Sequence, residues 1–202
     1  MSILEAIAAG LGVISVWFIV RRNVWAFPIG IVMVSLYILV FYRAKFYADM
    51  GLQVIYIGMQ IQGWILWTRG KKAIDQKIAI RRLSRIQWLY TLGIILAGTA
   101  LIGYLLSIKT DAALPYIDAL TTVISLTAQW WMNKKYLGNW VLWIVVDCIY
   151  LYQYSFKELY LTTGLYAVFL VLAILGYQEW KREEFQEQER DFTPDSFLTE
   201  SK

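Results

Sequence analysis

Histidine is absent from this chain of 202 residues, and cysteine occurs only once, as Cys148. The lack of histidine excludes His-based metal sites, Ser-His-Asp and Cys-His triads, and histidine proton relays. A single cysteine forms no internal disulfide. The sequence also has no Gly-rich phosphate loop between a strand and a helix and no cluster of metal ligands. We therefore expect neither a cofactor nor a metal.

Charge is scarce as well, because Asp, Glu, Lys and Arg make up 17% of the residues, against about 25% in ordinary soluble proteins. Hydrophobic residues make up 59%, and the mean hydropathy is +0.50. A chain of this length cannot bury so much apolar surface in its own core, so we expect a lipid bilayer around it. A disordered protein, a disulfide scaffold and a soluble nucleic-acid binder are excluded, and no nucleic-acid partner is expected.

Seven apolar runs are long enough to cross a bilayer, which takes about 17–25 residues per helix. The predicted fold is an all-α membrane protein with seven transmembrane helices. The predicted spans are Ile3–Val20, Trp25–Tyr42, Gly51–Trp67, Ile86–Leu106, Tyr116–Met132, Trp140–Phe156 and Leu159–Tyr177.

The positive residues divide unevenly between the two sides of such a fold. With the N-terminus outside, the inner segments carry 15 Lys and Arg residues and the outer segments carry four. The positive-inside rule therefore predicts an outer N-terminus and a cytoplasmic C-terminus. After Lys181 the chain turns acidic, and we expect 183–202 to extend the last helix and then form a disordered acidic cytoplasmic tail.

Sliding the sequence along itself by 113 residues aligns similar residues across three helices without a gap. We infer a duplication, with three-helix halves at 1–69 and 116–182, a basic cytoplasmic loop at 70–85 and a connector helix at 86–106. One connector gives both halves the same orientation, a parallel 3+1+3 repeat typical of transporters with a midplane site. Matched pairs include Trp17 with Trp130, Arg22 with Lys135, Tyr37 with Tyr150, Phe41 with Tyr154, Gly63 with Gly176, and Trp67 with Trp180.

Three predicted helices carry polar stripes at helical spacing, and polar groups within lipid usually face the interior of a bundle. Interfacial belts explain some of these residues, and a belt is favoured for Trp67, Trp140 and Tyr154. Interhelical hydrogen bonding and ligand contact both stay open for Gln53, Gln60, Ser125 and Gln129. The stripes are Gln53, Tyr56, Gln60, Trp64 and Trp67; Asp118, Thr122, Ser125 and Gln129; and Trp140, Trp143, Asp147, Tyr150 and Tyr154.

Other single residues have structural interpretations. Asp49 and Asp118 lie at outer span ends and are interpreted mainly as helix caps or gate edges. Cys148 is expected in the core. Four glycines are expected to allow close helix approach, namely Gly58, Gly63, Gly164 and Gly176.

Asp147 is the only charged residue near the middle of a predicted span. A carboxylate at that depth costs about 2.5–3.5 kcal/mol even on insertion scales, and no Lys or Arg lies within the spans to pair with it. We hypothesise that Asp147 attracts a cationic solute, with Trp143 and Tyr150 offering aromatic faces. The alternative is a protonated Asp147 bonded to a neighbouring helix.

Several ordered motifs resemble the PnuC family of bacterial vitamin transporters, over nearly the whole chain up to about Arg182. They are Phe46-Tyr47-Ala48-Asp49-x-x-Leu52-Gln53-x-x-Tyr56, followed by Gly63-Trp64-x-x-Trp67; Asp118-Ala119-x-Thr121-Thr122-x-x-Ser125-x-x-Ala128-Gln129; Asn139-Trp140-x-x-Trp143-x-x-x-Asp147; and Leu159-Tyr160-Leu161-Thr162, leading into Tyr166.

The resemblance implies a SWEET-like 3+1+3 fold in the bacterial inner membrane. It implies uptake of nicotinamide riboside by facilitated diffusion with alternating access and no coupling ion. Phosphorylation by a cytoplasmic kinase, without required contact, then traps the vitamin, and a homo-oligomer is left open. The predicted substrate-binding residues are Gln53, Tyr56, Gln60, Thr122, Ser125, Gln129, Trp143, Asp147 and Tyr150.

Other functions were weighed against this one. Thiamine is also cationic, planar and hydroxyl-bearing, and Gln60 stands where many nicotinamide riboside members carry Asn. An intramembrane enzyme needs paired catalytic groups at one depth, which this sequence lacks, so we expect no enzyme. A non-transporting scaffold or receptor leaves Asp147 without a role.

Overall fold

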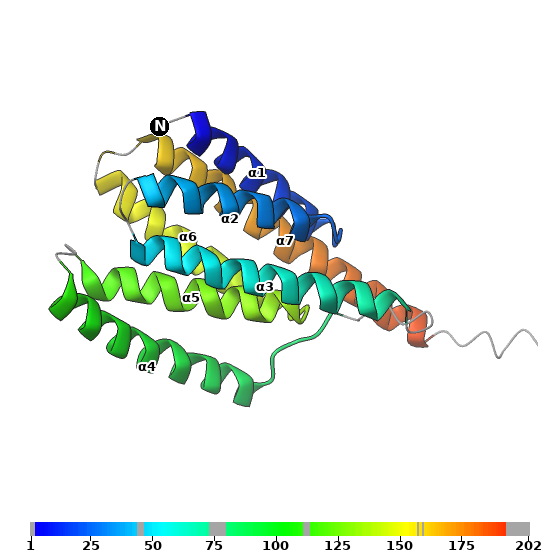
Figure 1. The fold of residues 1–202 in the computed structure, drawn as a ribbon. Helices are drawn as coiled ribbons and strands as arrows, with labels where there is room; N and C mark the ends of the chain where they lie inside the picture. Colours follow the sequence, from blue (N-terminus) through cyan, green and yellow to red (C-terminus); the bar gives the residue numbers. More distant parts are fainter. Residues whose placement is uncertain are drawn as a thin grey trace, which may run out of the picture.

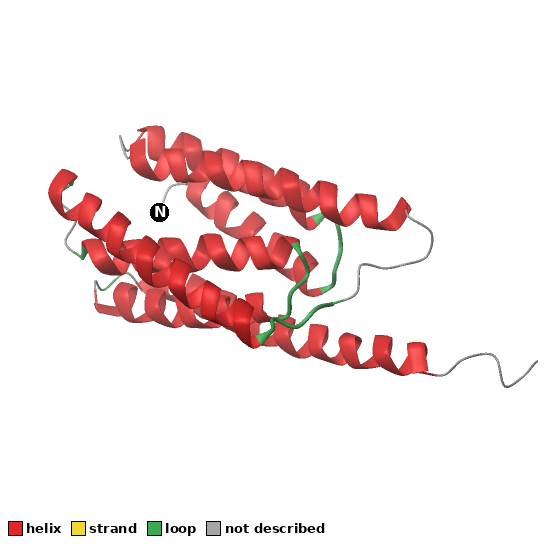
Figure 2. Ribbon diagram, turned by 90° about the horizontal axis from the view of Figure 1, so that it is seen from below, coloured by secondary structure: helices red, strands yellow, loops and turns green. Residues whose placement is uncertain are grey.

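The computed structural model describes residues 3–43, 47–72, 80–110, 114–156, 158 and 160–192. Within these ranges the regular structure is helical (Figure 2), apart from one β-bridge between Arg81 and Tyr136. The helices are α1 (Ile3–Val20), α2 (Ala26–Arg43), α3 (Tyr47–Lys72), α4 (Arg85–Lys109), α5 (Pro115–Asn133), α6 (Gly138–Phe156) and α7 (Tyr160–Phe192).

Each predicted span corresponds to one helix, and local signals set several of the ends. Ser84 begins α4 with a capping box, since its hydroxyl accepts from the Gln87 amide while the Gln87 side chain accepts from the Ser84 amide. Pro115 begins α5, where a missing N–H costs nothing. The predicted loop at 70–85 is shorter, because α3 continues to Lys72.

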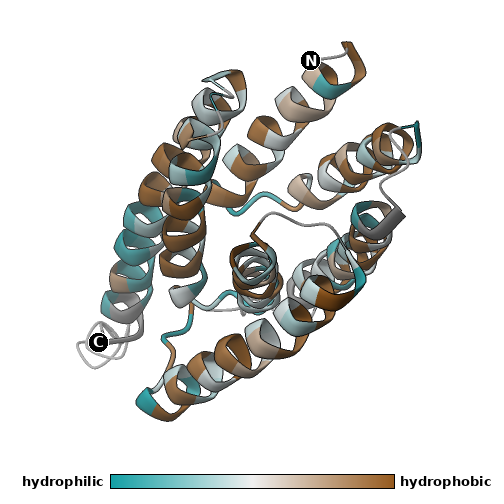
Figure 3. Cartoon of the chain, turned by 90° about the vertical axis from the view of Figure 1, so that its left-hand side faces the viewer, coloured by the Kyte–Doolittle hydropathy of each residue, from teal (hydrophilic) through white to brown (hydrophobic). Residues whose placement is uncertain are grey.

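The helices differ in how apolar they are. By length and composition, α1, α2, α4 and the 160–187 part of α7 can each cross a membrane. The other three, α3, α5 and α6, carry the predicted polar stripes. Hydrophobic residues cover most of the bundle, and hydrophilic ones gather on the C-terminal part of α7 (Figure 3).

Six helices pack in a closed ring, in the order α1, α2, α3, α5, α6, α7 and back to α1, and α4 packs against α5 outside it (Figure 1). The turns at 21–25 and 134–137 and the segment 80–84 share one end of the ring, here called the basic end. The opposite end, here called the acidic end, carries Glu5, Asp49, Asp118 and Glu158.

Large aromatic residues fill the core at the basic end. Phe27 packs edge-on against Trp67 with ring centroids 5.0 Å apart, and Trp140 packs edge-on against Trp180 at 5.5 Å. Trp67 and Trp180 meet at 6.0 Å. All four side chains are buried, so the interfacial belt predicted for Trp67 and Trp140 is wrong. The indole groups find core partners because helices from both ends of the sequence converge here.

The indole N–H groups of Trp67 and Trp180 each donate to a backbone carbonyl at or near a helix end. The Trp67 Nε1 donates to the Asn133 carbonyl at 3.1 Å, and the Trp180 Nε1 donates to the Ile19 carbonyl at 3.2 Å. Carbonyls in the last turn of a helix have no intrahelical partner. Each bond therefore satisfies a buried indole at a helix end, and the Ile19 carbonyl accepts from the Arg22 amide as well.

Two of the four predicted close-approach glycines do hold helices together. Gly63 lies against Phe27, and Gly176 lies against Trp140. Gly58 and Gly164 face open space, so the prediction is wrong for them. Cys148 is also exposed rather than in the core, because it lies on the outward face of α6, next to the inward-facing Asp147.

The packing predicts that Gly176→Ala destabilises the fold. A Cβ at residue 176 lies 2.5 Å from Trp140 ring atoms, and a rigid ring that is 1% exposed has no room to move. Overpacking of this kind costs about 1–3 kcal/mol, so the melting temperature of the detergent-solubilised protein should fall. Gly164→Ala on the same helix is the control, and equal melting of the two variants would contradict the packing.

Candidate substrate cavity

The ring of helices encloses a cavity of about 590 Å³. It begins among Glu5, Phe41 and Asp49 near the acidic end and reaches Met132 and Trp140 in the aromatic core. The nine residues predicted to bind substrate all line it, from α3, α5 and α6: Gln53, Tyr56, Gln60, Thr122, Ser125, Gln129, Trp143, Asp147 and Tyr150. The structure brings them together, and contact with substrate stays a prediction.

Among the described residues that line this wall, the acidic and basic side chains are all carboxyl groups. Asp147 is 4% exposed and lies at the centre of α6. Glu5 and Asp49 also line the cavity, and no Lys or Arg does among the described residues. The ion pairs within the described part of the chain do not involve Asp147 either. A cavity with charges of one sign attracts cations and repels anions.

Aromatic rings form much of the remaining wall. Tyr166 on α7 contacts both Tyr150 and Tyr154, with centroid distances of 4.5 Å and 5.2 Å, and these two rings stack on each other at 5.8 Å. Tyr37 stacks on Phe41 at 5.9 Å on α2. All five rings line the cavity, so the belt favoured for Tyr154 is wrong. Such rings present flat faces to planar or cationic solutes.

Polar groups of α3 and α5 meet across the cavity wall. Asn133 donates to the Met59 carbonyl at 2.8 Å and accepts from the Gln129 side chain at 2.9 Å. Gln129 therefore joins helices through Asn133 while it also lines the cavity. The side chains of Tyr56 and Tyr150 both interact with Ser125. These contacts fix the orientation of polar groups before any solute enters.

Gln60 fits because α2 has a glycine opposite it. A Cβ added to Gly30 would lie 2.6 Å from the Gln60 Nε2. Because Gly30 has no side chain, the Gln60 amide can occupy this space, and Gln60 is 8% exposed. The pattern of α3 alone did not indicate this pairing.

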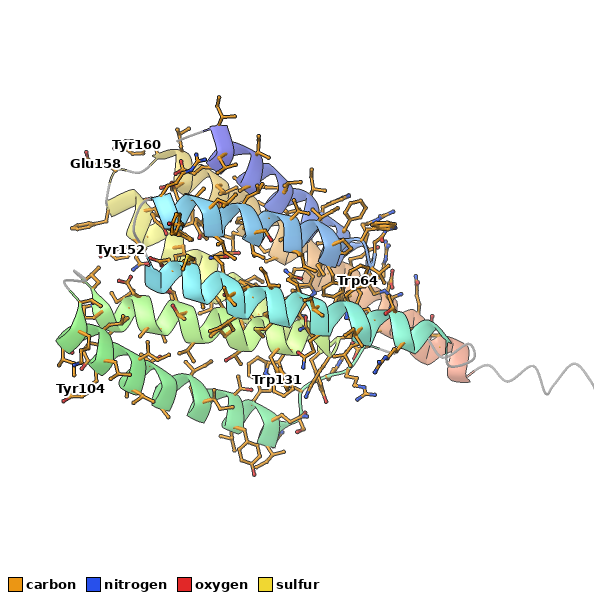
Figure 4. The ribbon with its side chains drawn as sticks, viewed as in Figure 1. Trp64, Tyr104, Trp131, Tyr152, Glu158 and Tyr160 are labelled. Carbon is orange, nitrogen blue, oxygen red and sulfur yellow. The ribbon has the colours of Figure 1, made fainter. Side chains whose placement is uncertain are left out.

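Some stripe residues lie outside the cavity. Trp67 belongs to the aromatic core, and Trp64 is 41% exposed on the outer surface (Figure 4). Asp118 lies in the first turn of α5, but Leu114 is the N-cap there and no side chain caps the helix, so the cap interpretation of Asp118 is wrong. Its carboxylate accepts from Gln153 at 3.4 Å. Trp131 points from α5 toward α4 and donates to the Thr91 hydroxyl at 3.1 Å (Figure 4).

Sequence reasoning missed several lining residues on the first and last helices. Glu5 and Tyr37 come from α1 and α2, and Tyr166 and Phe169 from α7. One signal was present for α7, because Thr162, Tyr166, Phe169 and Ala173 follow each other at steps of 4, 3 and 4 along one face.

A closed ring of mostly apolar helices around an acidic, aromatic cavity defines a multi-pass membrane transporter for a small solute. The model of the nicotinamide mononucleotide transporter family matches residues 2–182. The chain therefore belongs to this family, which is a family of transporters and not of enzymes, and the resemblance to PnuC proteins is confirmed.

Relatives and a solved structure agree with this assignment. The nicotinamide riboside transporter PnuC of Neisseria mucosa is 30% identical, over 89% of this chain and 72% of the relative. The transporter of the same name from Escherichia coli is 22% identical, over 89% and 85%. The crystal structure of the vitamin B3 transporter PnuC has a TM-score of 0.74 and 27% identity, over 91% of this chain and 82% of that one.

The α3–α5 junction predicts that Asn133→Ala lowers stability. The change removes the bond to the Met59 carbonyl and leaves the Gln129 amide without its partner. An unsatisfied buried polar group costs about 1–3 kcal/mol, so thermal unfolding in detergent should begin at lower temperature. Gln62→Ala removes only the longer 3.4 Å contact to Asn133 and serves as the comparison. An Asn133→Ala melting temperature at or above that of Gln62→Ala would refute this role.

Proposed function

We propose that this chain imports nicotinamide riboside by facilitated diffusion with alternating access. The observation that carries the proposal is the cavity wall, in which Asp147 lies among aromatic rings and no cation of the protein neutralises it in the described residues. Nicotinamide riboside has a positive pyridinium ring, which suits Asp147, Trp143 and Tyr150. Its ribose hydroxyls suit the amides of Gln53, Gln60 and Gln129.

The charge of the cavity also favours the riboside over the mononucleotide named by the family model. A phosphate needs Arg, Lys or a helix N-terminus to replace its water. Here it would meet Glu5 and Asp49 near the acidic end and Asp147 at the centre, so repulsion and desolvation both oppose it. Selectivity for the unphosphorylated form is what a trapping mechanism by a cytoplasmic kinase needs, because the product cannot leave by the same route.

The helix arrangement supports a parallel 3+1+3 repeat as the framework for alternating access. The two contacts between α1–α3 and α5–α7 are α3 with α5 and α7 with α1, which a two-fold axis would exchange. Residues 113 apart also make matching contacts. Phe27–Trp67 matches Trp140–Trp180, and Tyr37–Phe41 matches Tyr150–Tyr154 with the same interplanar angle of 24°. The outer helix α4 is the connector.

The distribution of Lys and Arg supports the orientation with the basic end in the cytoplasm and the acidic end outside. In this orientation the cavity reaches from the external side to the aromatic core. The bacterial relatives support an inner-membrane location.

The proposal predicts that Asp147→Asn abolishes most uptake without unfolding the protein. Removing one partner of a desolvated charge interaction costs about 2–5 kcal/mol, so flux of labelled nicotinamide riboside into proteoliposomes should fall roughly tenfold or more. Parallel flux of labelled thiamine and of the mononucleotide tests the substrate assignment. The proposal would be overturned if the wild-type protein carried thiamine but not nicotinamide riboside. It would also be overturned if Asp147→Asn carried riboside at the wild-type rate. Asp118→Asn, outside the cavity, is the matched control.

The Gly30–Gln60 contact predicts a separate effect on substrate affinity. In Gly30→Ala the flexible Gln60 amide can move aside, so the fold should survive while the amide leaves its place in the cavity wall. Losing one hydrogen bond costs about 0.5–1.5 kcal/mol, and the KM for riboside should rise severalfold at an unchanged melting temperature. Gly58→Ala, which meets nothing within 4 Å, should leave both quantities alone. An unchanged KM in Gly30→Ala would show that Gln60 does not bind substrate.

A further inference from the structure

The C-terminal part of α7 is bonded to the opposite half of the ring. The sequence indicated an acidic tail from residue 183, but its first residues are engaged. Arg22, in the turn between α1 and α2, pairs with both Glu183 and Glu187, and its Nη1 donates to the Glu187 Oε1 at 2.7 Å. The α7 helix thus continues to Phe192, while the predicted disordered tail at 193–202 lies outside the described residues.

The same stretch of α7 also holds the segment that leads into α4. Both carboxylate oxygens of Glu184 accept from the Arg82 Nε, at 2.8 Å and 3.0 Å. The second oxygen of Glu187 accepts from the Ile80 amide at 3.3 Å. Glu187 therefore joins the α1–α2 turn and the segment 80–84 through one side chain.

That segment is tied in turn to the α5–α6 turn. The Arg81 amide donates to the Lys135 carbonyl at 3.0 Å, and the Leu137 amide donates to the Arg81 carbonyl at 2.8 Å. The contacts form a continuous chain from the α1–α2 turn through α7 and the segment 80–84 to the α5–α6 turn. This chain of contacts includes every connection at the basic end that has described residues.

These contacts lie directly beside Trp67 and Trp180, which pack in one core cluster with the cavity-lining Met132 and Trp140 and are here called the floor of the cavity. Glu183 and Glu184 follow Trp180 by about one helical turn, so they move with it. Trp180 donates to the Ile19 carbonyl, and the Arg22 amide donates to the same carbonyl at 2.9 Å. Displacing α7 from Arg22 would therefore also pull Trp180 away from α1 and from Trp67.

Lys135 is the residue of the other half that matches Arg22, and it contacts Trp67. Arg22 and Lys135 are 113 residues apart, and both have left-handed backbone, with φ of 51° and 57°. Such angles are unfavourable for these residues and persist only where the surroundings fix them. The Lys135 ammonium lies 4.7 Å from the centroid of the Trp67 ring, a cation–π contact. One cation thus holds Trp67, and the other holds the helix of Trp180.

Partial burial gives the Arg22 pairs weight that a surface pair lacks, because the Arg22 side chain is 15% exposed and its two carboxylate partners are 26% and 21% exposed. Arg82 is 66% exposed, so its pair with the buried Glu184 is screened more by solvent. Arg182, which pairs with Glu179 within α7, is 65% exposed. Exposed pairs contribute little, whereas breaking a buried pair is costly. Every ion pair recorded for the described residues lies at the basic end.

We propose that Arg22 with Glu183 and Glu187, reinforced by Arg82 with Glu184, is a lock on the cytoplasmic gate. It holds Trp67 and Trp180 closed while the cavity is accessible from the other side, and it opens when solute is released to the cytoplasm. The lock rests on the alternating-access proposal above, and it adds residues outside the cavity that set which side is open.

The test measures access to the floor from the basic side without any substrate. Met132, which lines the cavity within the aromatic core, is replaced by cysteine in a Cys148→Ser background. A membrane-impermeant maleimide is applied to sealed vesicles of each orientation, with a C-terminal tag marking the basic side. Arg22→Gln and Glu187→Gln should raise the labelling rate from the basic side severalfold. The double variant Arg22→Glu with Glu187→Arg should return it toward the starting value.

Glu179→Gln is the matched control, because it makes the same chemical change on the same helix but breaks only a pair within α7. Labelling in Arg22→Gln and Glu187→Gln equal to that of Glu179→Gln would overturn the lock. If Arg22→Gln fails to fold, Glu187→Gln and Glu183→Gln, both near the basic end of the ring, carry the test. Labelling needs no riboside, so failed riboside flux with increased labelling refutes the proposed substrate and not the lock.

Discussion

The cost of placing polar side chains in hydrocarbon organises the whole bundle. An unpartnered polar group in lipid costs several kcal/mol, so Gln53, Ser125 and Asp147 have to turn away from the bilayer. Helices that carry such residues must therefore stand with their polar faces toward one another, and a ring is the arrangement that allows this for several helices at once. The three helices whose composition is least typical of a membrane span, α3, α5 and α6, supply the nine predicted binding residues.

A ring around a polar cavity then needs closure at one end, and the aromatic core provides it. Trp67 and Trp180 are large enough to meet across the ring, and their N–H groups satisfy carbonyls at the ends of α5 and α1. Gly63 and Gly176 make room for the rings that pack behind them. The same two side chains thus bond to carbonyls at helix ends through their N–H groups and fill the apolar core with their rings. This arrangement explains why both tryptophans are buried although each lies at the basic end of the ring.

The sequence predicted the seven helices and nine lining residues, because apolar length and 3.6-residue periodicity are local properties. Periodicity assigns a face but neither the depth nor the neighbour of that face. Trp64 and Trp67 therefore appeared in one stripe, although Trp64 lies on the outer surface and Trp67 lies in the core. Tyr166 and Phe169 were missed because an aromatic stripe on an apolar helix looks like ordinary packing. Glu187 looked like part of a solvated tail, since its partner Arg22 lies 165 residues away in the chain and no local pattern reveals such a pair.

The carboxylates that line the cavity and those on the C-terminal part of α7 act differently on a cationic solute. Asp49 and Asp147 line the cavity without a cation of the protein in its described wall, so their field acts on what enters. Glu183, Glu184 and Glu187 are paired with arginines and contribute little field of their own. A cation that leaves through the basic end passes Arg22 and Lys135, whose positive potential would otherwise oppose it. Glu183 and Glu187 stay on α7 beside this exit whether or not they contact Arg22, so their negative charge offsets that of Arg22 when the lock opens.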